Sequence, residues 1–386
     1  MTDCVLFLHG HQPYYNEEFI VKEIVWQSYG PLFKLLLDRS KDTDFQINLS
    51  LTGSVLQWFE RLENDYLLST LGELIDKGIV ELLLSPFYHA PLVFTNDGFI
   101  KEQFYHHRKM VKDLFGKEMR GLFPPEMIFS THKNQLVMDL DVDYLFVDGI
   151  YNSFHTDDVD GLWKLVTPKE IFVLVRNRAL SWHFSDNAFP NAHWMLTTIS
   201  KKSGPVTIGC DVECFGHHRS AESFKFLEYF LAHAKEKGVE LLTGKEAVKR
   251  NKQKAQIYQI EEITTWARSI NVFFPHSRII EMWFAQKEVE SMYHRLEFFY
   301  FQIERALQQT NEDEILLKEL IDFKVKKLDE VRWEIHRQLT DAALYHEDFS
   351  NKNTYRAMLL QSARIKANLW TLEQELLKQF NKSNKG

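Results

Sequence analysis

Short hydrophobic runs alternate with amphipathic stretches over about the first 250 residues. Eight runs have the length and composition of buried strands: residues 4–8, 46–51, 80–84, 121–123, 144–147, 171–175, 194–198 and 206–210. Helix-like stretches lie between several of them, at residues 69–77, 101–115 and 221–237. This alternation predicts an α/β fold with a mostly parallel sheet, and about seven or eight strands favour a closed barrel over an open sheet.

The pattern changes at about residue 256. Long stretches of charged and apolar residues follow, in which the apolar positions recur every three or four residues, as at Ile315, Leu316, Leu320 and Phe323. The sequence therefore predicts a barrel domain over residues 1–255 and an α-helical C-terminal domain over residues 256–386.

The composition is that of an ordinary globular protein, with 45% hydrophobic and 26% charged residues. Aromatic residues are frequent at 14%, enough to fill a large core and to line a pocket. The chain has 46 Lys and Arg against 54 Asp and Glu, a net charge of −8. A negative net charge disfavours nucleic acid or an anionic membrane as a partner.

Cysteine usage and the N-terminal residues bear on the compartment. Cys4, Cys210 and Cys214 form neither a disulfide framework nor two pairs of zinc ligands. No signal-peptide pattern is visible, and no stretch approaches the roughly 18–20 apolar residues of a membrane span. We expect a protein of the cytoplasm, and the sequence leaves its oligomeric state open.

Polar side chains follow five of the predicted strands. They are His9, His11 and Gln12 after the first run, His89 after the third, Glu126 after the fourth, Asp148 after the fifth, and Asp211 and Glu213 after the last. Two prolines stand directly before Glu126 and stiffen its support. Because the carboxyl ends of parallel strands meet at one edge, these side chains are expected to share a site.

Two chemistries could use these residues. In glycoside hydrolysis two carboxylates flank the scissile bond, and Glu126 and Asp211 are the natural pair. In metal-assisted hydrolysis His9, His11 and His89 with an acid would be the ligands. The residues alone leave both open.

Four segments of the chain resemble motifs of glycoside hydrolase family 57. They are HGHQPYY at residues 9–15, GIVELLLSPFYH at 78–89, GLFPPE at 121–126 and IGCDVECFGHH at 208–218. They occur in the family's order over about residues 1–220. The third motif often has Trp two residues before the Glu, where this chain has Pro124, and the family's fifth motif is not identified here. Trp266 and Trp283 are candidates for that motif, but we expect both to be core residues.

The resemblance implies an incomplete (β/α)7 barrel with a C-terminal helical segment and a retaining mechanism on α-linked sugars. Glu126 would be the nucleophile and Asp211 the general acid/base. The remaining side chains would bind or support the sugar: His9, His11, Gln12, His89, Asp148 and Glu213. No cofactor or metal ion is implied, and the partner would be an α-linked oligo- or polysaccharide.

The sequence is therefore interpreted as a retaining α-glycosidase or α-glucanotransferase acting on α-1,4-glucan or maltooligosaccharides. An α-galactosidase or a glucan branching enzyme of the same family is an alternative. A metal-dependent carbohydrate deacetylase is an alternative from another class of chemistry, and a non-catalytic glucan-binding homologue is a third. The two carboxylates Glu126 and Asp211 argue against the third.

Overall fold

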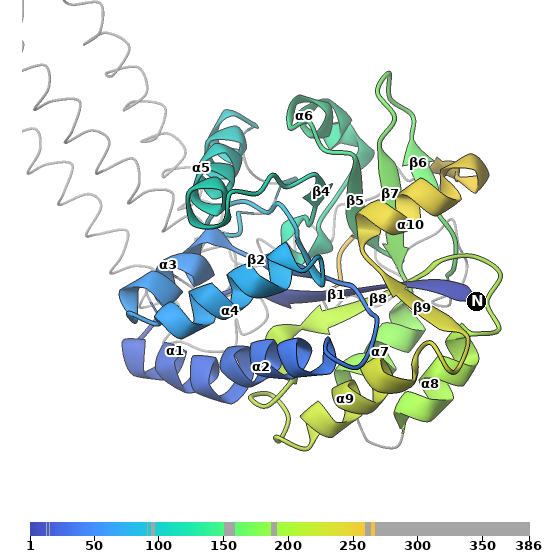
Figure 1. The fold of residues 1–386 in the computed structure, drawn as a ribbon. Coiled ribbons are helices and arrows are strands. Elements are labelled where there is room, and N and C mark those ends of the chain that lie inside the picture. The colour runs from blue at the N-terminus through green and yellow to red at the C-terminus, as the bar shows by residue number, and fades with distance from the viewer. Residues whose placement is uncertain are drawn as a thin grey trace, which may run out of the picture. The chain divides into compact units, whose positions relative to one another are not determined.

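The computed structural model describes residues 1–12, 14, 16–90, 92–93, 97–149, 159–186, 191–258 and 264–266 (Figure 1). The chain divides into two compact units, Met1–Phe273 and Phe274–Gly386, and every described residue belongs to the first. Most of the predicted helical domain over residues 256–386 therefore lies outside the described residues.

Seven parallel strands form a ring in the described part of the chain. In order around the ring they are β1 (Thr2–Gly10), β2 (Ile47–Leu51), β3 (Val80–Leu82), β4 (Gly121–Leu122), β5 (Tyr144–Asp148), β7 (Phe172–Arg176) and β8 (Val206–Asp211). At two places around the ring, neighbouring strands pair through a single residue pair only. A single bridge, Leu84–Leu122, connects the end of β3 to β4, and β7 meets β8 at one residue pair, Arg176–Thr207. The fold is thus the predicted α/β, incomplete (β/α)7 barrel.

Three further strands extend this ring. Strand β6 (Trp163–Leu165) pairs antiparallel with β7, β10 (Gln256–Tyr258) pairs with β6, and β9 (Val239–Leu242) pairs with β1. The hydropathy pattern did not predict these short strands.

Helices surround the strands in Figure 1. The α-helices are α1 (Glu18–Ile24), α2 (Gly30–Arg39), α3 (Gly53–Arg61), α4 (Asp65–Asp76), α5 (Asp97–Phe115), α6 (Asn134–Asp139), α7 (Arg178–Asp186), α8 (Asn191–Ile199), α9 (Ser223–His233) and α10 (Gly244–Asn251). A π-helix, η1 (Val25–Tyr29), joins α1 to α2. Short 3-10 turns are η2 (Pro125–Met127), η3 (Thr131–Lys133), η4 (Val212–Cys214) and η5 (Lys252–Lys254).

The strand predicted at residues 194–198 is wrong, because this segment lies within helix α8. Its buried residues are Ala192, Met195, Leu196 and Ile199. Their spacing of three, four and seven is that of one helix face, and the run of apolar letters concealed it.

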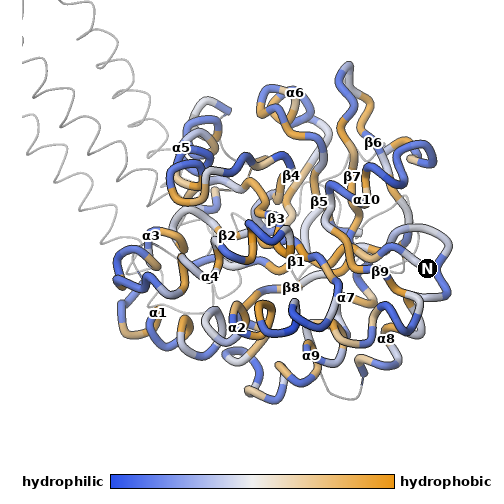
Figure 2. The backbone as a smooth tube through the Cα atoms, viewed as in Figure 1, coloured by the Kyte–Doolittle hydropathy of each residue, from blue (hydrophilic) through white to orange (hydrophobic). Residues whose placement is uncertain are grey.

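Alternate residues of the strands fill the inside of the ring. Val5 and Phe7 of β1, Tyr144 and Phe146 of β5, and Phe172 and Leu174 of β7 belong to one buried cluster. Figure 2 shows hydrophobic residues concentrated along these central strands. Because strand side chains alternate between faces, the next positions in each series, such as His9 after Val5 and Phe7, also face the interior.

No helix in the described part of the chain has the length and apolar character needed to cross a bilayer.

Candidate active site

The predicted residues gather where the parallel strands end. His9 is the last but one residue of β1, and the register of β1 with β8 places it directly beside Asp211. Residues paired across two strands project from the same face, so His9 and Asp211 face the same way. His89 and Glu126 follow β3 and β4 at the same edge of the ring.

Three histidines and a phenylalanine form a stack of rings. Phe123 lies on His9, His9 on His89 and His89 on His11, with centroid separations of 4.5, 4.6 and 4.5 Å and nearly parallel planes. Hydroxyl groups of strand β2 and its exit orient two of the imidazoles. His9 Nδ1 is 3.2 Å from Ser50 Oγ, and His11 Nδ1 is 3.0 Å from Thr52 Oγ1.

These imidazoles are neutral near pH 7. Burial lowers the pKa of His9 and of His11 well below the ordinary value, and the neighbouring ring of His89 lowers both further. Burial lowers the pKa of His89 to about 3. Three ring nitrogens have no protein partner among the described residues: His9 Nε2, His11 Nε2 and His89 Nδ1. Buried polar atoms of this kind are normally paired, so these nitrogens are available to a ligand or to water.

Glu126 is held by two donors, one on each carboxylate oxygen. His89 Nε2 lies 3.2 Å from Oε1, and Trp266 Nε1 donates to Oε2 at 2.8 Å. The backbone carbonyl of Glu126 also accepts from the Trp266 N–H at 3.1 Å and from Thr265 Oγ1 at 3.0 Å. The segment at residues 264–266 therefore holds both the carboxylate and the backbone carbonyl of Glu126.

Burial raises the pKa of Glu126 above its ordinary value, while the Trp266 hydrogen bond and the nearby His9 oppose that rise. The side chain nevertheless retains 18% of its exposure, whereas that of His89 retains 1%. Glu126 is thus a carboxylate in a mostly apolar setting that a ligand can reach.

Glu213, two residues after Asp211, belongs to a hydrogen-bonded network. Its Oε1 accepts from Tyr29 Oη at 2.5 Å and from Gln12 Nε2 at 2.8 Å, and burial raises its pKa. Asp211 itself is half-buried at the end of β8. Two acidic residues only two positions apart therefore differ in surroundings, because one is enclosed and the other borders the open edge.

Asp148 is enclosed beside an arginine. It is fully buried, and its Oδ2 accepts from Arg176 Nη1 at 2.6 Å. Arg176 also donates to the Gly209 carbonyl and lies 5.5 Å from the centre of the Trp266 ring. Asp148 is thus connected to Glu126 through Arg176 and Trp266.

Sequence reasoning missed several residues that organise this site. Tyr29 lies within a helical pattern that gives no sign of its bond to Glu213, and Ser50 and Thr52 read as ordinary strand-end residues. Trp266 was expected in the core; it does pack against the buried cluster, and it also donates to Glu126. Its position after a long stretch without a recognised motif gave no signal of this contact. Trp283 lies outside the described residues.

The arrangement suits nucleophilic and acid–base chemistry by carboxylates. It offers one reachable carboxylate fixed by neutral donors, a second acid at the end of β8, and imidazole nitrogens that have no partner among the described residues. In the described ranges, no three His, Cys, Asp or Glu side chains are grouped so that they could hold a metal ion.

Comparison with known proteins identifies a family. The model of glycosyl hydrolase family 57 matches residues 5–260. A candidate alpha-amylase of Methanocaldococcus jannaschii is 29% identical over 271 residues, which are 65% of this chain and 56% of that protein. Alpha-amylase 1 of Dictyoglomus thermophilum is 27% identical over 151 residues, 38% of this chain and 21% of that one. The chain thus spans between about a fifth and just over half of the length of these curated relatives.

Solved structures share the fold. A family 57 branching enzyme from Thermococcus kodakaraensis superposes with a TM-score of 0.74 at 14% identity, covering 99% of this chain and 94% of that one. An alpha-amylase from Thermotoga maritima gives 0.72 at 14% identity, covering 98% and 96%. At this identity the likeness concerns the fold, and the sequence match over residues 5–260 supplies the family. The chain belongs to glycosyl hydrolase family 57.

Proposed function

We propose that this protein is a retaining α-glycosidase or α-glucanotransferase that acts on α-1,4-glucan or maltooligosaccharides. The observation that carries the proposal is the Glu126 carboxylate, which is fixed by His89 and Trp266 yet 18% exposed at the edge where Asp211 ends its strand. In this proposal Glu126 is the nucleophile and Asp211 is the general acid/base.

The reaction would proceed in two displacements. Glu126 attacks the anomeric carbon while Asp211 gives its proton to the departing glycosidic oxygen, which leaves a covalent glycosyl-enzyme. Asp211 then takes a proton from the incoming hydroxyl, which attacks the same carbon and releases Glu126. Water as the acceptor gives hydrolysis, and a sugar hydroxyl gives transfer. Retention requires the two carboxyl groups to lie about 5–5.5 Å apart.

The neutral histidines have a role in binding the sugar. His9 and His11 each keep one unpartnered ring nitrogen, which can bond a sugar hydroxyl as donor or acceptor. His89 orients Glu126 and offers its Nδ1 in the same way. Because these rings are uncharged, they leave the negative charge of Glu126 available for attack.

Three further residues would act through their neighbours. Gln12 donates a hydrogen bond to Glu213. Glu213 in turn would support the end of strand β8, which carries Asp211. The buried Asp148 carboxylate is already paired with Arg176, so we assign it to holding Arg176 against Trp266 rather than to a direct sugar contact.

The names of the relatives support the choice of α-glucan as substrate. Proteins similar to this chain are named as alpha-amylases, and a 22% identical relative from Thermococcus kodakarensis is named as a 4-alpha-glucanotransferase. Branching activity and α-galactoside cleavage remain the outcomes against which this choice is tested. Incubation with maltooligosaccharides, α-galactosides and glycogen, followed by product analysis, distinguishes the three.

The nucleophile is tested by replacing Glu126 with Ala. We expect kcat to fall by about four orders of magnitude or more, because the covalent step is lost. Azide should restore part of the activity and give a glycosyl azide of inverted configuration, since the small anion attacks from the vacated face. NMR of the products of the intact enzyme should show retention at the anomeric carbon. In Asp211→Ala, substrates with good leaving groups should be affected less than natural ones.

Glu118→Ala is a matched control, since that side chain is 67% exposed and bonds only a surface lysine in the described structure. Its activity should equal that of the unchanged protein. Substantial activity in Glu126→Ala, or an inverted product from the unchanged enzyme, would show that the nucleophile is wrongly assigned.

We also propose that the enzyme works in the cytoplasm. Cys4, Cys210 and Cys214 are buried and form no disulfide bond in the described part of the chain, which supports a reducing compartment. Fractionation of cells that express the chain under its own promoter is the test, and recovery outside the cytoplasm would contradict the proposal.

A further inference from the structure

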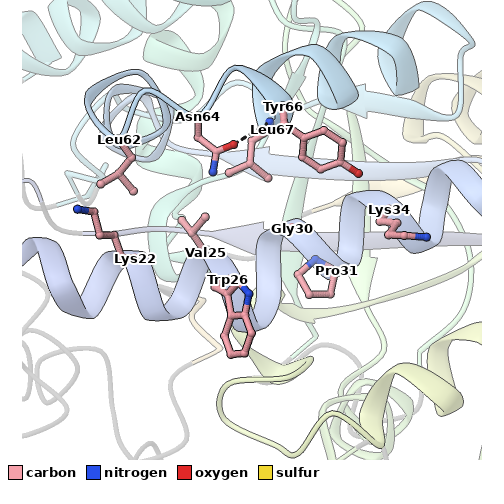
Figure 3. Close-up of a pocket in the computed structure, with 10 residues that line it drawn as sticks. All are labelled: Lys22, Val25, Trp26, Gly30, Pro31, Lys34, Leu62, Asn64, Tyr66 and Leu67. Atoms are coloured by element: carbon pink, nitrogen blue, oxygen red, sulfur yellow. Dashed lines mark hydrogen bonds between the residues drawn. The ribbon is translucent and has the colours of Figure 1, made fainter.

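An open hollow of about 520 Å³ lies on the outer face of the barrel domain, between the helix pair η1–α2 and the start of α4 (Figure 3). Two aromatic side chains, Trp26 and Tyr66, line it together with the apolar Pro31 and Leu62. Trp26 is 77% exposed and Tyr66 is 56% exposed. Trp26 is the most exposed large hydrophobic side chain in the described part of the chain.

The contacts of the π-helix η1 explain why the Trp26 indole is exposed to solvent. Within η1, Val25, Ser28 and Tyr29 are buried, and Tyr29 and Ser28 bond Glu213 and the Val212 carbonyl. These inward contacts fix the helix and leave Trp26 pointing outward. A single exposed aromatic residue is ordinary, but two that border one hollow with apolar walls are characteristic of a binding surface.

Charge in the hollow favours a neutral ligand. Lys22 is paired with Glu18, and Lys34 with Asp38, each at 2.6 Å, so each lysine that lines the hollow has an acidic partner, although Asp38 also pairs with Lys41 at 2.8 Å. Asn64 accepts from the Leu67 N–H through its Oδ1, which leaves its amide N–H groups as hydrogen-bond donors. The surface thus combines exposed ring faces, a polar amide and little net charge.

We propose that this hollow binds a segment of an α-glucan chain outside the catalytic cleft. The C–H faces of glucose units would pack on Trp26 and Tyr66, because the negative face of an aromatic ring attracts weakly positive C–H groups. Sugar hydroxyls would bond Asn64 and the lysine side chains. This inference rests on the proposed function and adds to it that the substrate is polymeric and is held at two places.

Native gels that contain amylopectin test the proposal. The unchanged protein should migrate more slowly than in a plain gel. Trp26→Ala and Tyr66→Ala should each weaken this binding about fivefold to tenfold, and the double variant should weaken it further. Turnover of maltoheptaose should stay within about twofold of the unchanged protein, which also shows that the variants fold. The matched control is Trp194→Ala, since Trp194 is 47% exposed on α8.

Three outcomes would overturn the inference. The double variant could be retarded as strongly as the unchanged protein, or Trp194→Ala could lose as much binding as Trp26→Ala. Sedimentation could also show a dimer that Trp26→Ala dissociates, which would make the hollow an interface between copies. Failure of the proposed function can be distinguished from failure of this inference. The unchanged protein would then show no turnover of maltoheptaose, whereas the gel measures glucan binding independently of turnover.

Discussion

At the residue scale, backbone strain is concentrated around Glu126. His89, Glu126 and Met127 have φ values of +68°, +54° and +49°, in the left-handed region that side chains with a Cβ rarely occupy. Such conformations cost about 1–3 kcal/mol each and persist only where surrounding contacts impose them. Here those contacts are the bonds from residues 264–266 to the Glu126 carbonyl and carboxylate. The strained turn aims the carboxylate at the open edge.

Replacing Trp266 by Phe should shift the pH dependence of activity. The Trp266 N–H stabilises ionised Glu126, so its removal raises a carboxyl pKa that burial has already raised. In the proposed mechanism Glu126 is the nucleophile and must be ionised, so activity should be lost as pH falls through this pKa. The acid limb of kcat/KM should therefore move to higher pH, by about one unit for the loss of a charge-assisted hydrogen bond.

Trp58→Phe is the control for this experiment. Trp58 is equally aromatic and 2% exposed, but it lies in α3, where the Arg61 guanidinium is 4.5 Å from its ring centre. A Trp266→Phe enzyme whose profile keeps its acid limb while only KM changes would show that Trp266 merely packs.

At the scale of elements, the end of β1 and the π-helix η1 form one unit. Gly10 separates His9 from His11, and a Cβ at this position would lie 2.6 Å from Tyr29 Oη and 2.9 Å from Leu51 Cδ2. Tyr29 Oη is the group that bonds Glu213. The strand exit can therefore approach η1 only because residue 10 has no side chain.

Gly10→Ala should reduce both stability and activity. The added methyl group meets the Tyr29 hydroxyl in a closed space, and overpacking of this kind costs about 1–3 kcal/mol. Urea denaturation measures that loss, and kcat on maltoheptaose should fall because Tyr29 is displaced from Glu213.

Gly72→Ala is the matched substitution in helix α4. Its Cβ would lie 3.6 Å from Phe115, an ordinary contact, and replacing a helical glycine by alanine stabilises by about 0.5–1 kcal/mol. If Gly10→Ala were as stable and active as Gly72→Ala, the proposed coupling of β1 to η1 would be wrong.

At the scale of the whole molecule, ring closure creates the site. Strands β1, β3, β4, β5 and β8 each deliver one part of it at their carboxyl ends. Residues far apart in the chain, such as His89 and Glu126 or Gln12 and Glu213, then come within hydrogen-bond distance. The barrel interior below them is apolar, and burial at this edge lowers the pKa values of His9, His11 and His89 and raises those of Glu126 and Glu213.

Catalysis by the intact enzyme should not depend on a metal ion. The imidazoles of His9, His89 and His11 are stacked, so their nitrogen lone pairs lie in nearly parallel planes and do not converge on one point. After exhaustive chelation and gel filtration, we expect turnover of maltoheptaose to be unchanged. A stoichiometric transition metal in the purified protein, with activity lost on its removal and restored on its return, would favour the deacetylase alternative instead.

The sequence by itself determined the barrel and the chemical groups at its edge. Strand–helix alternation predicted the parallel sheet, because buried parallel strands need continuous apolar runs. His9, His89, Glu126 and Asp211 could be singled out because each lies within five residues after such a run, and the family motifs then suggested their roles.

The tertiary structure alone decided which groups form hydrogen bonds to these site residues. Trp266 and Tyr29 reach Glu126 and Glu213 from 140 and 184 residues away along the chain, and no local pattern encodes such contacts. The burial of Asp148 by Arg176 and the helical state of residues 194–198 were likewise settled by packing. Hydropathy reports whether a residue prefers to be buried, whereas its partner depends on how the ring of strands closes.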